Sequence, residues 1–98
     1  MTIKKIHIFI SGRVQGVSYR YWFQTEANKR KLVGWVRNTT SNRVEAEIIG
    51  KKDQVDKMFE LCKEGPSLAN VKDVITRPIK QLSEANTEIN KVHILKTN

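Results

Sequence analysis

The chain has 98 residues, which is the size of one domain, and we expect a single domain over residues 1–98. Its one cysteine, Cys62, excludes an internal disulfide, and the apolar run at 6–10 is too short for a signal sequence or a membrane span. These features predict a soluble cytoplasmic protein. The formal net charge of +8 favours an anionic partner, but it does not choose among nucleic acid, a membrane surface and a small phosphorylated molecule.

The first predicted elements are a strand and a helix. Isoleucines alternate with polar residues over 6–10, as in a half-buried strand, and Phe9 falls on the opposite face, so we expect that face to be partly covered as well. Helical spacing follows, with an apolar stripe of Tyr19, Trp22, Phe23 and Ala27 and a basic run at 29–31 that suits a helix end. Ser18 is a plausible N-cap for this helix.

The next pattern is a β-hairpin, with strands at 33–38 and 43–49, a polar turn at 39–42, and Gly50 ending the second strand. A second helix carries the stripe Val55, Met58, Phe59 and Cys62 and stops at Gly65 and Pro66.

Residues 71–80 read as another strand, in which Pro78 marks an edge position or the strand's end. A polar loop at 83–90 and a short apolar strand at 92–95 complete the chain. The order strand, helix, strand, strand, helix, strand is the split βαβ or ferredoxin-like pattern. We therefore expect an α+β two-layer sandwich, with both helices on one sheet face and an extra short strand at the C-terminal end.

The stretch 12–20 joins the first strand to the first helix and is a candidate anion site. Gly12 and Gly16 would let the backbone turn so that successive N–H groups point inward, and Arg20 falls just inside the helix, where a guanidinium can bind two phosphate oxygens. An ordinary strand-to-helix loop explains the same spacing, and two glycines alone favour that simpler interpretation.

Two longer segments carry more information. Gly-Arg-Val-Gln-Gly-Val at 12–17 with Tyr19 and Arg20, and Gly-Trp-Val-Arg-Asn at 34–38, resemble the two signature segments of the acylphosphatase family. The resemblance extends to Val44-Glu45 and to the Gly65-Pro66 helix stop, so it covers nearly the whole chain. It implies hydrolysis of acyl phosphates to a carboxylate and inorganic phosphate, without a metal or other cofactor.

The resemblance also implies roles for individual residues. Arg20 would bind the phosphate, and Asn38 would orient the attacking water, for which an amide that both donates and accepts is well suited. The remaining phosphate contacts would be backbone N–H groups of the loop, at Val14, Gln15, Gly16, Val17, Ser18 and Tyr19. Inorganic phosphate or sulfate should then compete with the substrate.

The absence of an acid in this stretch agrees with that substrate class. No Asp, Glu or His falls within 12–20. An acyl phosphate releases a carboxylate whose conjugate acid has a pKa of about 4, so the leaving group needs no general acid.

The chain departs from the family pattern at three places. The family usually has Phe at the position of Tyr19 and a Gly near the position of Lys31. It usually has an Asp-Gly turn where this chain has Ser41-Asn42. The Tyr19 hydroxyl must find water or a partner, and Asn42 tolerates the left-handed conformation that Gly would otherwise supply. We expect these changes to affect stability and hairpin geometry more than the reaction.

Other residues that could carry chemistry have simpler explanations. We expect core positions for Cys62 and for four aromatic residues, Tyr19, Trp22, Phe23 and Trp35. His7 and His93 have no ligand partner at short spacing, so we expect sheet-surface residues and no metal site. Arg13 and Arg37 rank below Arg20, and Ser18 has no base nearby that would make it a nucleophile.

Two other functions stay open on the sequence alone. Ferredoxin-like domains include readers of single-stranded RNA, but residues 43–50 contain no aromatic for stacking, so we do not expect nucleic acid as a partner. A non-catalytic module that binds an acyl phosphate for a partner enzyme would differ mainly at Asn38. We expect a monomeric enzyme with a small-molecule substrate and no membrane contact.

Overall fold

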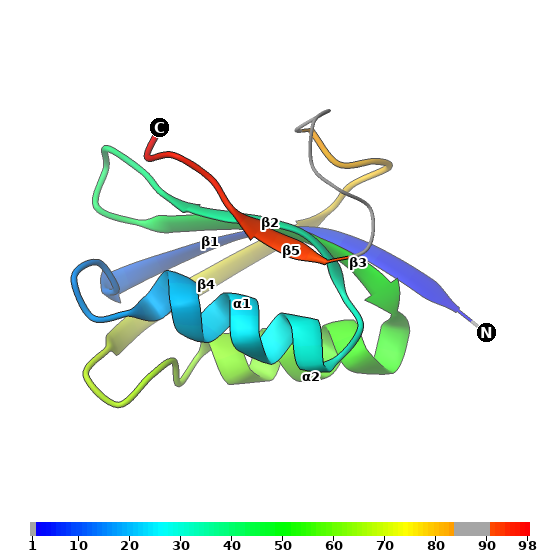
Figure 1. Cartoon of the computed structure of the whole chain (residues 1–98), viewed down its shortest axis with the longest axis horizontal. Coiled ribbons are helices and arrows are strands. Elements are labelled where there is room, and N and C mark those ends of the chain that lie inside the picture. The colour runs from blue at the N-terminus through cyan, green and yellow to red at the C-terminus, as the bar shows by residue number, and fades with distance from the viewer. Residues whose placement is uncertain (1, 84–90) are drawn as a thin grey trace.

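A five-stranded sheet with two helices on one face makes up the computed structural model, which describes residues 2–83 and 91–98 (Figure 1). The elements are β1 (Ile3–Arg13), α1 (Tyr19–Lys29), β2 (Val33–Asn38), β3 (Val44–Lys51), α2 (Lys52–Cys62), β4 (Asn70–Pro78) and β5 (Val92–Ile94). Apart from Ser83, the predicted loop at 83–90 lies outside the described residues.

The sheet has the strand order β4-β1-β3-β2-β5, in which β5 runs parallel to β2 and all other pairs are antiparallel. Helix α1 packs against β2 and β5, and α2 packs against β1 and β3. The expected ferredoxin-like two-layer sandwich with an extra C-terminal strand is confirmed. Each βαβ crossover places its helix on the same face, so only that face acquires a continuous apolar core.

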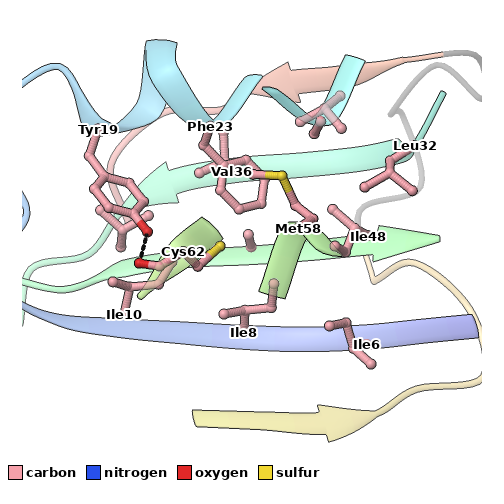
Figure 2. Packing of buried hydrophobic residues seen from close by; sticks show 14 of the residues in the cluster. Ile6, Ile8, Ile10, Tyr19, Phe23, Leu32, Val36, Ile48, Met58 and Cys62 are labelled. Atoms are coloured by element: carbon pink, nitrogen blue, oxygen red, sulfur yellow. Dashed lines mark hydrogen bonds between the residues drawn. The ribbon is translucent and has the colours of Figure 1, made fainter. Parts of the chain in front are cut away.

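The core lies between this sheet face and the helices (Figure 2). Ile6, Ile8 and Ile10 of β1 point towards the helices because side chains two apart in a strand share a face. Phe23 of α1 and Met58 of α2 pack against them from the helix layer, and both are fully buried. Burying side chains of this size contributes about 1.5–3 kcal/mol each, so this layer is the main source of stability.

The helix-free face is also covered in part, as expected from Phe9. One row across the sheet contains His7 of β1, Glu47 of β3 and Trp35 of β2, and all three are buried. The prediction that His7 lies at the sheet surface was wrong in its exposure. Its Nε2 lies 2.7 Å from Glu45 Oε2, and its ring contacts Phe9, so pairing and aromatic packing remove it from solvent.

Several predicted boundaries also need correction. Gly50 does not end its strand, because the long β1 pairs Lys4 with Gly50 and Ile3 with Lys51. Helix α1 ends at Lys29, and Lys31 takes a left-handed conformation with φ 61°, in the region where the family usually has glycine. Pro78 is the last residue of β4, which is an edge strand, so both of its expected positions hold.

Candidate active site

The loop between β1 and α1 contains two glycines with different structural roles. Gly12 lies inside β1, where the register with β4 shifts, and a Cβ there would collide with the Asn70 carbonyl oxygen. Its role is therefore close packing of two strands and not the turn of an anion cradle, which corrects our interpretation of the pair. Gly16 has φ 73° and is exposed within the loop, so it is the glycine that turns the backbone there.

Three side chains hold this loop against the rest of the molecule. Val14 and Val17 are buried in the core cluster. The side-chain amide of Gln15 donates to the carbonyl oxygens of Thr39 and Arg43, at 2.9 Å each. Because Thr39 N–H also donates to the Arg43 carbonyl oxygen at the base of the β2–β3 turn, Gln15 ties the loop directly to the end of β2.

The start of α1 faces the same region, but Ser18 does not cap it as we expected. Ser18 has φ 65°, and its hydroxyl makes no capping hydrogen bond. The first helical bond runs from Trp22 N–H to the Ser18 carbonyl oxygen at 3.0 Å, and the first turn carries no acidic residue. The N–H groups of the first turn therefore have no intrahelical acceptor, and they favour an anion.

Asn38 reaches this region from the last position of β2. Strand alternation places its side chain on the helix side, in the same row as Val44 and Ile10, whereas Arg37 points to the other face. The backbone of Asn38 is held by β3 on one side and by Asn98 N–H, which donates to its carbonyl oxygen at 3.1 Å, on the other. A strand end supported on both sides is a rigid position for a functional side chain.

These segments surround a hollow of about 240 Å³ at one end of the molecule. Its lining consists of Val14, Gly16, Ser18, Tyr19, Arg20, Tyr21 and Asn38. The structure thus brings together six of the eight residues predicted for the site. The two others, Gln15 and Val17, lie in the same loop but turn their side chains towards the hairpin and the core.

The hollow contains positive charge and no carboxylate. The side chain of Arg20 makes no ion pair or hydrogen bond within residues 2–83 and 91–98. The Oδ1 atom of Asn38 is buried and has no hydrogen-bond partner in the same part of the chain. Buried polar atoms are nearly always satisfied, so an amide oxygen and a guanidinium without partners in this part of the chain, in one hollow, indicate a place where a polar ligand binds.

Tyr19 connects the hollow to the second helix. Its ring is buried, and its hydroxyl donates to the Cys62 carbonyl oxygen at 2.7 Å (Figure 2). Burial raises the pKa of the Tyr19 hydroxyl, with a further contribution from Cys62. Burial also raises the pKa of the Cys62 thiol to about 12. Both groups are neutral at physiological pH, so Tyr19 is a structural anchor, and the expectation that Cys62 is a core residue is confirmed.

Other polar clusters offer no comparable site. A larger depression at the start of α2 is lined by Thr2, Lys51, Lys52, Asp53 and Asp56. There Asp56 already pairs with Lys4 and Lys52. Within the described ranges no three His, Cys, Asp or Glu side chains gather in a way that could hold a metal ion. In the same ranges no helix is long and apolar enough to cross a membrane.

Sequence reasoning missed two features of the site. Gln15 was assigned through its backbone, yet its side chain makes the contact to the hairpin; two carbonyl acceptors 24 and 28 residues away leave no local signal. Tyr21 lines the hollow, but it falls off the apolar stripe of α1, so no periodic pattern singles it out.

Comparison with known proteins identifies the family of this chain. The family model described as Acylphosphatase matches residues 6–91. Acylphosphatases of Alcanivorax borkumensis and of Roseiflexus sp. are 48% and 43% identical over 75 and 84 residues, which are 76% and 86% of this chain and 79% and 90% of theirs.

A solved structure gives the same result. The crystal structure of acylphosphatase from Bacillus subtilis superposes with a TM-score of 0.84 at 33% identity, covering 96% of this chain and 99% of that one. The loop, the arginine and the asparagine that suggested the resemblance thus lie around one hollow in a fold that this enzyme shares. The chain belongs to the acylphosphatase family, whose members are enzymes that hydrolyse acyl phosphates.

Proposed function

We propose that Arg20 and the N–H groups of the 14–19 loop hold the phosphoryl group of an acyl phosphate in this hollow, and that Asn38 orients the attacking water. Three features support the assignment: the exposed left-handed turn at Gly16, the guanidinium of Arg20, which has no partner among the described residues, and the start of α1, which has no acidic residue in its first turn. The substrate is a small molecule.

The observation that carries this proposal is the buried Oδ1 of Asn38, which lies in the same hollow as Arg20 and has no hydrogen-bond partner in the described part of the chain. A carbonyl oxygen in that place accepts a hydrogen bond from water and so aims one of the water's lone pairs at phosphorus. Phosphoryl transfer passes through a loose transition state, for which positioning and stabilisation of spread negative charge are the main requirements. Arg20 meets the second requirement and Asn38 meets the first.

The reaction needs neither a general acid nor a metal at this site. The water oxygen bonds to phosphorus as the bond from phosphorus to the acyl oxygen breaks, and the electron pair of that bond leaves on a carboxylate. Both protons of the water stay on phosphate oxygens, so inorganic phosphate leaves as dihydrogen phosphate. Because that carboxylate is the conjugate base of an acid with a pKa of about 4, it departs without protonation. Positive charge from Arg20 and the backbone dipoles stabilises the equatorial oxygens.

The test follows the loss of a chromogenic aromatic acyl phosphate in the presence of a chelator. We expect turnover by the wild type, with inorganic phosphate or sulfate as competitive inhibitors. Asn38→Ala should lower kcat by about 10- to 100-fold with little change in KM, because water positioning acts in the transition state.

Asn28→Ala is the matched control, since the Asn28 amide oxygen accepts from Val92 N–H away from the hollow. This variant should lose stability and keep its kcat. Absence of wild-type turnover, or equal effects of the two substitutions on kcat, would contradict the roles proposed here. Phosphate binding without turnover would instead support a non-catalytic module. Tight, salt-sensitive RNA binding would favour a nucleic-acid function.

We also propose that the protein acts as a monomer in the cytoplasm, with no membrane or nucleic-acid partner. The support for a monomer is that the residues proposed for the site, including Val14, Arg20 and Asn38, line the hollow within a single chain. Sedimentation at working concentration should give the mass of one chain.

A further inference from the structure

The hollow at the start of α1 is lined mainly by polar groups that suit a phosphoryl group and a water. If the phosphoryl group and the water contact Arg20, Asn38 and the loop N–H groups, as the proposed function requires, the acyl group lies against the rest of the lining. The residues there decide which acyl groups bind well.

Among the described residues that line the hollow, only one offers an apolar surface for that acyl group. Val14 and Tyr19 are 1% exposed, so their side chains belong to the core, and Gly16 has no side chain. Ser18 is small and polar, and Arg20 and Asn38 are used by the phosphate and the water. Tyr21 remains, with 71% of its surface exposed.

The ring of Tyr21 is not engaged elsewhere. Within residues 2–83 and 91–98 it makes no hydrogen bond, ring contact or ion pair. Tyr21 is the third residue of α1, and Cα–Cβ bonds in a helix tilt towards its N-terminus, which is the end that faces the hollow. An aromatic side chain left in solvent beside a binding site is suited to stack with a planar ligand group.

We propose that Tyr21 forms an acyl-binding subsite at the rim of the hollow and that it favours acyl phosphates with an aromatic or similarly flat apolar acyl group. This inference rests on the proposed function, because it assumes that the phosphoryl group occupies the hollow. It concerns selectivity among substrates and not the chemical step, so Tyr21 is a specificity residue.

The experiment compares benzoyl phosphate with acetyl phosphate for the wild type, Tyr21→Phe and Tyr21→Ala. Tyr21→Ala should lower kcat/KM for benzoyl phosphate by about fivefold, as expected for the loss of one stacking contact, and change the value for acetyl phosphate less than about twofold. Tyr21→Phe keeps the ring and should stay within about twofold of the wild type for both substrates.

Leu68→Ala is the matched control, because Leu68 is an exposed apolar residue, 69% accessible, that does not line the hollow. It should leave the ratio of the two substrates unchanged. Equal losses for both substrates in Tyr21→Ala, or no loss for either, would overturn the subsite.

A binding arm separates this inference from the reaction. Phenylphosphonate and methylphosphonate carry similar anionic groups with and without a ring. The wild type should bind phenylphosphonate about fivefold more tightly, and Tyr21→Ala should remove that preference without changing the affinity for inorganic phosphate. If the wild type binds both phosphonates equally, the subsite is absent. If it binds them as expected but hydrolyses no acyl phosphate, the subsite stands and the proposed catalysis fails.

Discussion

The two faces of the sheet differ in whether their polar side chains have hydrogen-bond partners, and residues 37 and 38 show this difference most directly. Arg37 points to the helix-free face, where its Nε donates to Glu45 Oε1 at 3.0 Å and its guanidinium lies over the Trp35 ring. Asn38 points to the helix side, and its Oδ1 has no partner among the described residues. One step along a strand thus separates a satisfied network from an open site.

The two arginines differ in the same way. Arg37 faces a carboxylate that is also bound to His7, so its charge is balanced. Arg20 lies in a hollow whose described lining contains no acidic residue. Its guanidinium makes no ion pair in the described part of the chain. An arginine whose charge is already balanced has little left for a ligand, which is why we assign the proposed phosphate site to the helix side and a stabilising role to the other face.

Replacing each arginine in turn gives the largest expected contrast. Arg20→Gln should lower kcat/KM by about 100-fold, since each charge-assisted hydrogen bond lost contributes about 1.5–3 kcal/mol. Arg37→Gln removes the same charge from the other face and should change kcat/KM less than about threefold. Steady-state kinetics on both variants measures these changes. Similar losses of kcat/KM in the two variants would contradict the assignment of the substrate site to the helix side.

Glu45→Gln tests the helix-free face by itself. It leaves Arg37 and His7 without their carboxylate in a half-buried setting, and we expect a loss of about 2–3 kcal/mol in the free energy of unfolding. Glu60→Gln removes a carboxylate from an exposed pair with Lys63 and should cost less than about 0.5 kcal/mol. Urea denaturation measures both, while kcat and KM of folded Glu45→Gln should stay near wild-type values.

Gln15→Met tests whether the loop and the end of β2 must be held together. Both hydrogen bonds to the hairpin are lost while side-chain length is kept, so kcat should fall by about tenfold with a smaller change in KM. Gln24→Met is the control. Gln24 lies in α1 and donates to the carbonyl oxygen of Val92 in β5, so its loss removes a similar hydrogen bond that does not hold the 14–19 loop. If the two variants lose stability alike and neither loses kcat, Gln15 is a structural residue only.

The smallest effect concerns the neutral groups buried on the helix side. Because burial raises the pKa of Cys62 to about 12, the unfolded thiol ionises at a lower pH than the folded one. Stability from this thiol is therefore complete below about pH 8.5 and declines as the pH rises towards 12, by about 1–2 kcal/mol at pH 10. Cys62→Ala should flatten the stability profile between pH 8 and 10, with a remaining slope from Tyr19, whose pKa is also raised. If Cys62→Ala leaves the slope of stability against pH unchanged, folding does not raise the pKa of the Cys62 thiol.

Local patterns in the chain determined most of the fold. The alternation in β1 and β3 and the stripe of α2 depend on which residues avoid water, and their periods are properties of the chain itself. Arg20, Gly16 and Asn38 could be named because they lie in two contiguous segments that resemble a family. Boundaries were less certain, as at Gly50, because a strand continues as long as its neighbour does.

Tertiary structure decided how the two segments meet. No local pattern shows that the Gln15 amide reaches the Thr39 and Arg43 carbonyl oxygens, that Gly12 serves the β1–β4 contact, or that His7 is buried beside Glu45. These contacts join residues far apart in the chain, so their energies depend on the whole fold. The sequence by itself determined which residues could bind a phosphate, and only the packing of β1, β2 and α1 brought Arg20 and Asn38 to one hollow with Tyr21 at its rim.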